Sequence, residues 1–95
     1  MIVSPEAREE LRGIEDYIAQ DNPQAALTFV ERLTARFQEL VDFPGIGSKR
    51  DELRAGYRSI AEGNYVIYYR VRPEVVEIMH VLHGAQDAKK VFEQE

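Results

Sequence analysis

Cysteine is missing from these 95 residues, which excludes disulfides and thiolate metal sites. A chain without cysteine suits a reducing compartment. Only Met1, Ile2 and Val3 precede a helix-capping residue, so the start of the chain predicts neither a signal peptide nor a membrane span. We therefore expect a cytoplasmic protein with no membrane partner, folded as a single domain over residues 1–95.

The usual signatures of catalysis and cofactor binding are missing too. The sequence has no nucleophile elbow, no HExxH element and no Walker-type element. The loop 45–56 has two close glycines, but no GK[ST] element follows them, so a phosphate cradle is disfavoured. His80 and His83 should point to opposite faces of a strand and cannot share a metal ion. No metal and no cofactor is expected, and His83, beside Gly84 at a strand end, is the better functional candidate of the two histidines.

Charge is present but unevenly placed. The net charge is −5, and residues 1–43 carry nine acidic and four basic side chains. Residues 44–72 reverse this balance, with three acidic side chains against six basic ones: Lys49, Arg50, Arg54, Arg58, Arg70 and Arg72. A basic patch on an acidic protein suits nucleic acid or an acidic partner segment, and a solvated loop and strand edge is the alternative.

Cap chemistry predicts two helices. Ser4 caps the first, with Pro5 at its first position and Glu6 in its first turn. Asn22 and Pro23 repeat the pattern, and 43–45 (Phe-Pro-Gly) ends the second helix. Since so few residues separate them, the two helices should form an antiparallel α-hairpin.

Each predicted helix has one apolar stripe. The inward residues are Ala7, Leu11, Ile14 and Ile18 in the first, and Ala26, Phe29, Val30, Leu33, Phe37, Leu40 and Val41 in the second. The acidic pairs at 9–10 and 15–16 are adjacent in sequence and do not face each other on a helix, so a solvated face explains them better than catalysis.

The second half of the chain predicts strands. Ile2-Val3 forms a short first strand, and β-branched and aromatic runs at 57–61, 65–72 and 75–83 are separated by turns at 63–64 and 73–74. Residues 86–95 predict a loose terminal helix. The fold class is therefore α+β: a β-α-α-β-β-β order, with the helical hairpin packed on one face of a small antiparallel-rich sheet.

From Tyr65 to Val71 the central strand is apolar or aromatic at almost every position, which is unusual for a sheet with one face in water. Alternation groups its side chains as Tyr65, Ile67, Tyr69 and Val71 against Val66, Tyr68, Arg70 and Arg72. In strand 75–83 it groups Val76, Ile78, His80 and Leu82 against Val75, Glu77, Met79, Val81 and His83. The helices cover one face only, so we expect a partner outside the chain to cover the other.

The succession of motifs resembles the ParE branch of the ParE/RelE toxin superfamily. The motifs are S-P-x-A, D-N-P, F-P-x-x-G, G-Y-R, Y-x-x-x-Y-R-V and V-x-H-G, spread over nearly the whole chain. The resemblance implies the toxin of a type II toxin–antitoxin pair. Its partners would be a cognate antitoxin, ParD-like or related, that wraps it in a hetero-oligomer, and DNA gyrase as target, with no sequence-specific DNA binding by this chain.

The resemblance also bears on mechanism. RelE-like members cut messenger RNA in the ribosome with basic residues and a tyrosine or histidine, whereas ParE-like members lack that set and poison gyrase. Here Val66 follows Tyr65 where RelE has an arginine, and Gly84 and Ala85 lie where a basic residue is expected. This favours the gyrase branch and a non-enzymatic toxin. Many ParE-like chains read H-G-R-R-D where this one has Ala85 and Gln86, which implies reduced toxicity if those arginines bind the target.

The residues expected to bind the antitoxin or the target are Arg54, Tyr57, Arg58, Tyr68, Arg70, Arg72, His83 and Asp87. Among them, Arg58 and Arg70 are the expected anchors for antitoxin carboxylates, and pairing within the chain is the alternative. No catalytic residue is expected. If the chain is instead a ribosome-dependent endonuclease, Arg58, Arg70 and His83 are the candidates; a weakened toxin that only binds antitoxin is the third reading.

Overall fold

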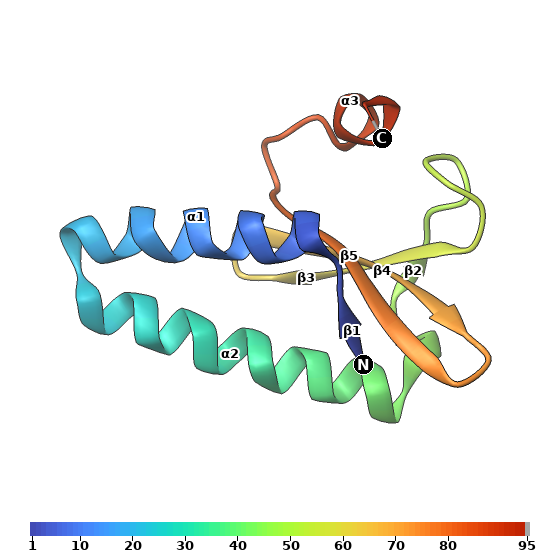
Figure 1. The fold of residues 1–95 in the computed structure, drawn as a ribbon, viewed down its shortest axis with the longest axis horizontal. Helices are drawn as coiled ribbons and strands as arrows, with labels where there is room; N and C mark the ends of the chain where they lie inside the picture. The colour runs from blue at the N-terminus through green and yellow to red at the C-terminus, as the bar shows by residue number, and fades with distance from the viewer. Residues whose placement is uncertain (95) are drawn as a thin grey trace.

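The computed structural model describes residues 1–94. The elements in chain order are β1 (Ile2–Val3), α1 (Pro5–Asp21), α2 (Pro23–Asp42), the 3-10 helix η1 (Pro44–Ile46), β2 (Ser48–Lys49), β3 (Tyr57–Glu62), β4 (Tyr65–Arg72), β5 (Val75–His83) and α3 (Ala88–Glu93). The strands form one five-stranded sheet in the order β1-β5-β4-β3-β2, with β1 parallel to β5 and the other neighbours antiparallel. In Figure 1 the α1–α2 hairpin runs along the sheet, and α3 lies apart from the hairpin. The predicted α+β class is confirmed.

The two long helices begin at the predicted caps. The Ser4 hydroxyl accepts a hydrogen bond from the Ala7 N–H at 3.0 Å and donates one to the Met79 carbonyl at 2.8 Å. Asn22 Oδ1 accepts from the Ala25 N–H at 3.1 Å. Each cap satisfies a backbone donor that the first helical turn leaves without a partner, and Ser4 in addition ties α1 to β5.

The main core lies between the hairpin and the sheet. It is built from Ala7, Leu33, Phe37, Leu40, Ile67, Tyr69, Val76, Ile78 and Val81. Phe37 is buried there, as the apolar stripe predicts, while Leu11, Ile14 and Phe29 pack against the core and remain half-buried. Val30 and Val41 were expected to point inward and instead lie exposed at the margins of the stripe.

The strand predictions hold for β1, β4 and β5, and β3 extends one residue further, to Glu62. Within the predicted loop 45–56 the chain forms β2, which pairs with β3 and so continues the sheet at its edge. Gly47 allows this close approach, because a Cβ there would lie 2.5 Å from the Tyr69 hydroxyl oxygen and 2.8 Å from the Ser59 carbonyl oxygen. The predicted terminal helix forms only over Ala88–Glu93, and Glu95 lies outside the described residues.

A β-bulge breaks the alternation of β5. Tyr68 pairs with His80 and Tyr69 with Ile78, so Met79 is an extra residue in β5. The predicted face of Val81 is therefore wrong: Val81 joins Val76 and Ile78 in the hairpin-side core. Leu82 packs on the opposite face of the sheet. The side chains after the bulge therefore point to the faces opposite to those that simple alternation predicts.

The expectation that this chain leaves the second sheet face bare is wrong over part of that face. Phe92 of α3 packs there with Tyr57, Tyr68 and Leu82, all of them buried. Leu53, from the segment between β2 and β3, packs against the same group. The six-residue helix α3 thus covers the part of the face around Tyr68. It does not cover the part nearest the β4–β5 turn.

Candidate binding surface

The part of the second sheet face beneath α3 holds two predicted binding residues, Tyr57 and Tyr68. Both rings meet Phe92 edge to face, with centroids 5.5 Å and 5.2 Å away. Burial raises the pKa of the Tyr68 phenol above its ordinary value. These side chains form a small core with α3 and are not exposed to a partner in this arrangement.

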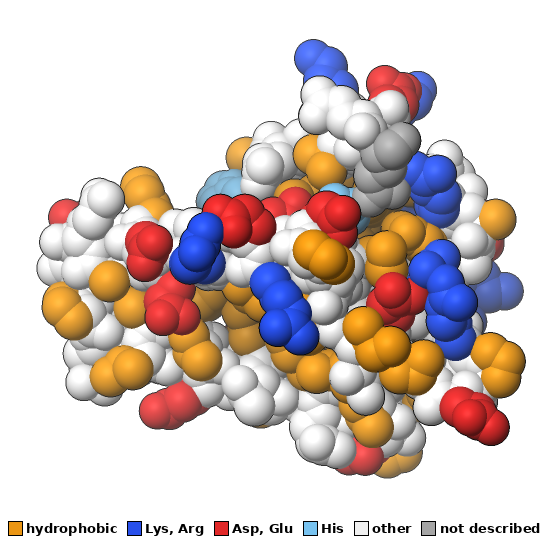
Figure 2. Space-filling model, in the orientation of Figure 1, with side chains coloured by type: hydrophobic (Ala, Val, Ile, Leu, Met, Phe, Trp, Pro, Cys, Tyr) orange, Lys and Arg blue, Asp and Glu red, His pale blue; other side chains and the backbone are white. Residues whose placement is uncertain are grey.

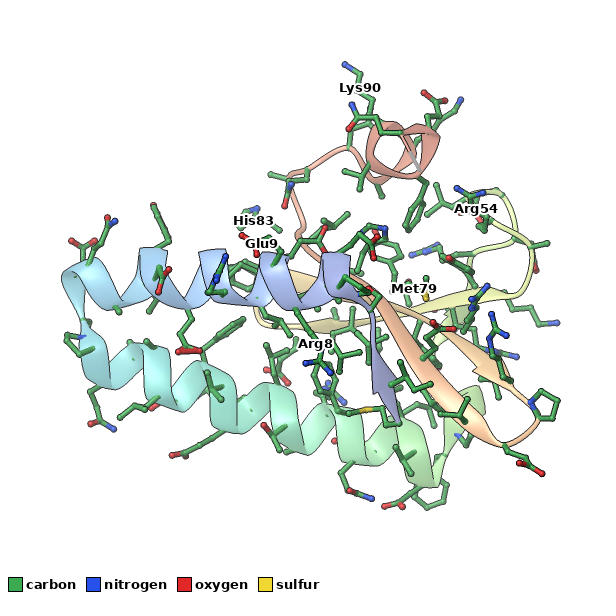
Figure 3. The ribbon with its side chains drawn as sticks, viewed as in Figure 1. Arg8, Glu9, Arg54, Met79, His83 and Lys90 are labelled. Atoms are coloured by element: carbon green, nitrogen blue, oxygen red, sulfur yellow. The ribbon has the colours of Figure 1, made fainter. Side chains whose placement is uncertain are left out.

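Two further predicted residues hold α3 in place. Arg54 Nη2 donates to the Phe92 carbonyl oxygen at 2.8 Å, and Figure 3 shows Arg54 beside α3. Asp87 caps the helix, accepting from the Lys89 N–H at 3.1 Å and the Lys90 N–H at 3.4 Å. The Arg54 contact attaches α3 to the segment between β2 and β3, and the Asp87 contacts stabilise the first turn of α3.

Beyond α3, the second face carries an arginine pair on β4. The Arg70 Nε donates to Glu77 Oε1 at 2.7 Å, and the Arg72 Nε donates to the same oxygen at 3.1 Å. The arginines hold the pKa of the Glu77 carboxyl below its ordinary value, chiefly through the Arg70 hydrogen bond. One carboxylate between two guanidinium groups leaves a net positive charge, and Arg72 is half exposed. This end of the face suits a partner that brings carboxylates.

Arg58 lies on the hairpin side of the sheet. Its Nη1 donates to the Gly47 carbonyl at 2.8 Å and to the Gly45 carbonyl at 3.3 Å. The buried Tyr69 hydroxyl secures the same loop, donating to the Pro44 carbonyl at 2.7 Å and accepting from the Gly47 N–H at 2.9 Å. Burial raises the pKa of Tyr69 above its ordinary value. Arg58 therefore positions the turn after α2, on the face opposite Arg70.

His83 is exposed at the end of β5 and stacks edge to face on Tyr65, with centroids 5.4 Å apart. Its Nδ1 accepts from the Ala85 N–H at 3.0 Å. As the acceptor in this contact, Nδ1 carries no proton, so the proton of the neutral ring is on Nε2. The proton-accepting nitrogen of a neutral ring is thus already occupied, which is a poor arrangement for a general base.

The three nuclease candidates do not converge. His83 pairs with Tyr65 at one end of β4, and Arg70 lies five residues along that strand, roughly 17 Å away at 3.3 Å per residue, on the opposite face. Arg58 pairs with Tyr69, four residues from Tyr65. No single phosphodiester group can contact all three residues in this structure.

Sequence reasoning missed the role of Glu10, which was assigned to a solvated helix face. Its Oε1 accepts from the Val81 N–H at 3.0 Å, and its Oε2 lies 2.9 Å from Nδ1 of the buried His80. Glu10 thereby provides an acceptor for a backbone N–H group on the edge of β5, just past the point where β1 ends. The pairing joins residues seventy positions apart, so no local pattern signals it.

Sequence reasoning also missed an exposed apolar area where α2 ends near the β4–β5 turn. Met1, Val41 and Val71 are 53, 41 and 46% exposed and line a shallow groove of about 270 Å³ with Pro44 and Pro73. The end of the α2 stripe at Val41 is the only sequence signal for it. The groove adjoins Arg72, so apolar and basic surfaces meet there.

Charge on the surface follows the division seen in the sequence. Figure 2 shows most acidic side chains in view over the two long helices, whereas Lys and Arg gather at the right, over the strand ends, and at the top, over α3. Among residues 1–94 no group of acidic and histidine side chains is arranged to hold a metal ion. No helix in the described part of the chain is long and apolar enough to cross a membrane.

Comparison with known proteins adds a family to this geometry. Residues 1–88 match the model of the ParE toxin of the type II toxin–antitoxin system parDE. Toxin ParE1 of Caulobacter vibrioides is 35% identical over 88 residues, covering 92% of this chain and 91% of the relative. Toxin ParE1 of Mycobacterium tuberculosis is 30% identical over 92 residues, covering 94% and 93%, and Toxin RelE3 of Caulobacter vibrioides is 26% identical over 85 residues, covering 88% and 92%.

The fold agrees with a solved structure. A chain of the chromosomal ParDE toxin–antitoxin system from P. aeruginosa superposes with a TM-score of 0.73 at 19% identity, covering 87% of this chain and 95% of that one. At that identity the likeness shows a shared fold. The family match spans β1 to the start of α3 and therefore includes the sheet and both long helices. Taken together, these matches show that the chain belongs to the ParE toxin family of type II toxin–antitoxin systems.

Proposed function

We propose that this toxin acts by binding DNA gyrase, without catalysis of its own, and that a cognate antitoxin of the ParD type or related neutralises it in a hetero-oligomer. The observation that carries the non-enzymatic part is the separation of Arg58, Arg70 and His83 over two faces and along the length of β4. Phosphodiester cleavage requires charge stabilisation and proton transfer at one point. Each candidate instead contacts groups within the chain.

The antitoxin would occupy the end of the second sheet face that α3 leaves open. Arg70 and Arg72 present net positive charge there beside the apolar groove of Met1, Val41 and Val71. A segment with apolar anchors and carboxylates matches both features. Of the residues predicted from sequence, Arg70 and Arg72 fit this role best; Tyr57 and Tyr68 would take part only if α3 moved away.

Two assays with the purified chain test the mechanism. In a gyrase supercoiling assay we expect inhibition or trapped cleaved DNA, and in a translation extract we expect intact messenger RNA. Cleavage at the ribosomal A site that disappears with His83→Ala or Arg58→Ala would overturn the proposal in favour of the endonuclease. The similarity to Toxin RelE3 is the reason for testing this alternative.

Inactivity in both assays would support the weakened-toxin reading. Ala85 and Gln86 are both exposed in the turn before α3. Replacing both by arginine should then restore gyrase inhibition, because the H-G-R-R-D pattern of similar chains would be rebuilt. Wild-type chain bound to its antitoxin is the control for either assay, since neutralised toxin should show neither activity.

A further inference from the structure

A hollow lies between α1 and the end of β5, away from the arginine pair. Its volume is about 620 Å³, and its lining residues include Glu10, Gly13, Tyr17, Tyr65, His83 and Gln86. We call it the α1 hollow. In the view of Figure 3, His83 lies along the edge of α1. A hollow of this size with converging polar groups is the ordinary form of a binding site.

Gly13 lies in the wall of the hollow that α1 forms, and it has no side chain to cover the helix backbone there. It lies in the middle of a 17-residue helix, where glycine destabilises the helix relative to alanine. A Cβ built at Gly13 would meet no atom within 4 Å, so neither packing nor backbone conformation requires glycine there. The effect of the missing side chain is to leave helix backbone accessible to a ligand in the α1 hollow.

The surroundings of Gly13 are acidic and aromatic. On a helix its surface neighbours are the residues three and four positions away: Glu9, Glu10, Asp16 and Tyr17. Tyr17 is 71% exposed, and Tyr65 and His83 form the facing wall. The nearest basic side chain on the helix, Arg12, pairs with Glu9 at 2.7 Å, and both are 70% exposed, so water screens that pair.

We propose that the α1 hollow binds an arginine side chain presented by a partner protein. A guanidinium group can stack on the Tyr17 or Tyr65 ring and donate to the Glu10 carboxylate, while its aliphatic stem lies on Ile14 and Leu82. Glu9 and Asp16 lie on the neighbouring surface of α1 and add negative charge beside the hollow. The charge of this surface is opposite to that of the Arg70–Arg72 surface. It is therefore a second interaction site, and the inference does not depend on the proposed function.

The test uses short acetylated and amidated peptides with one central arginine between two leucines, titrated into the ¹⁵N-labelled chain and followed by NMR. A peptide with citrulline in place of arginine is the matched control, since it keeps the shape and removes the charge. The arginine peptide should shift the amides of Gly13, Tyr17 and Gln86 saturably and bind at least tenfold more tightly than the citrulline peptide. Equal binding of the two peptides, shifts centred elsewhere, or no shift would overturn the proposal.

Variants then locate the site. Gly13→Leu should block the part of the hollow over Gly13 and abolish the shifts, whereas Gly13→Ala should retain them, because its added Cβ meets only open space. Circular dichroism of both variants checks that they are folded. Glu9→Gln combined with Asp16→Asn should weaken binding at least threefold, and Arg12→Gln should strengthen it by removing a competing guanidinium. Unchanged binding by Gly13→Leu, or unchanged binding by the doubly neutralised variant, would place the peptide outside the α1 hollow.

Discussion

At the scale of single residues, Tyr69 shows how one side chain links distant parts of this fold. Its ring is fully buried on the hairpin side of β4, and its hydroxyl bridges Pro44 and Gly47 in the turn after α2. Alternation along the strand predicts the burial. The two hydrogen bonds could not be predicted, because they join residues 22 and 25 positions away in sequence.

Tyr69→Phe should lower the free energy of unfolding by about 1–3 kcal/mol, since the Gly47 N–H and the Pro44 carbonyl lose a buried partner. Urea denaturation followed by circular dichroism measures the change. Tyr17→Phe is the matched control, because Tyr17 is 71% exposed, and it should leave stability within about 0.5 kcal/mol. Equal effects of the two substitutions would show that the buried hydroxyl contributes nothing.

Glu77 should make stability sensitive to acid. Its pKa is lowered in the folded state by Arg70 and Arg72, so it binds a proton less readily there than in the unfolded chain. The stabilisation is complete above the ordinary glutamate pKa of about 4.3 and is lost as the pH falls through the lower folded value. Unfolding measured from pH 7 to pH 2 should show a smaller acid-induced loss of stability in Glu77→Gln than in the wild type. Identical pH profiles would show that Glu77 does not contribute to the acid sensitivity of stability.

At the scale of elements, the sequence predicts where the helices and strands lie but not how α3 is used. Caps at Ser4 and Asn22 and turns at 63–64 and 73–74 are local signals, and the elements they delimit are present. The bulge at Met79, the pairing of β2 and the docking of Phe92 all depend on contacts between distant segments. Local patterns contain no information on them.

Phe92→Ala should cost about 3 kcal/mol, because it opens a cavity between α3 and Tyr57, Tyr68 and Leu82. If α3 then leaves the sheet, binding of the dye ANS should rise as the second face becomes exposed. Lys90→Ala, at an exposed position of the same helix, is the control and should change neither quantity. A Phe92→Ala variant with wild-type stability would mean that α3 does not cover the face in solution.

At the scale of the whole molecule, charge divides the protein into an acidic helical side and a basic sheet side. The residue counts predict this division directly. They do not predict how the arginines are used, because Arg54 and Arg58 contact backbone carbonyls while Arg70 and Arg72 share Glu77. Not every arginine that was predicted to bind a partner therefore presents its charge to solvent. The hydrogen-bond partners of each side chain within the chain decide which of them do.

The basic side should control association with the proposed antitoxin. Replacing Arg70 and Arg72 by glutamine should weaken the complex at least tenfold, because partner carboxylates lose charged donors. The same two-charge change at Arg12 and Arg32, on the helices, should alter affinity less than threefold. Isothermal titration calorimetry at low and high salt measures both effects. Equal losses from the two pairs would point to net charge alone, without a localised site.

The parallel pairing of β1 with β5 has a consequence for how the protein is made. Ile2 and Val3 are added by the ribosome 75 residues before their partners Glu77 and Ile78. Until β5 is made, β1 has no neighbouring strand, and the α-hairpin has only part of the sheet to pack on. The native toxin surface can therefore form only once β5 has been translated, so nascent chains interrupted before β5 should be harmless to the cell that makes them.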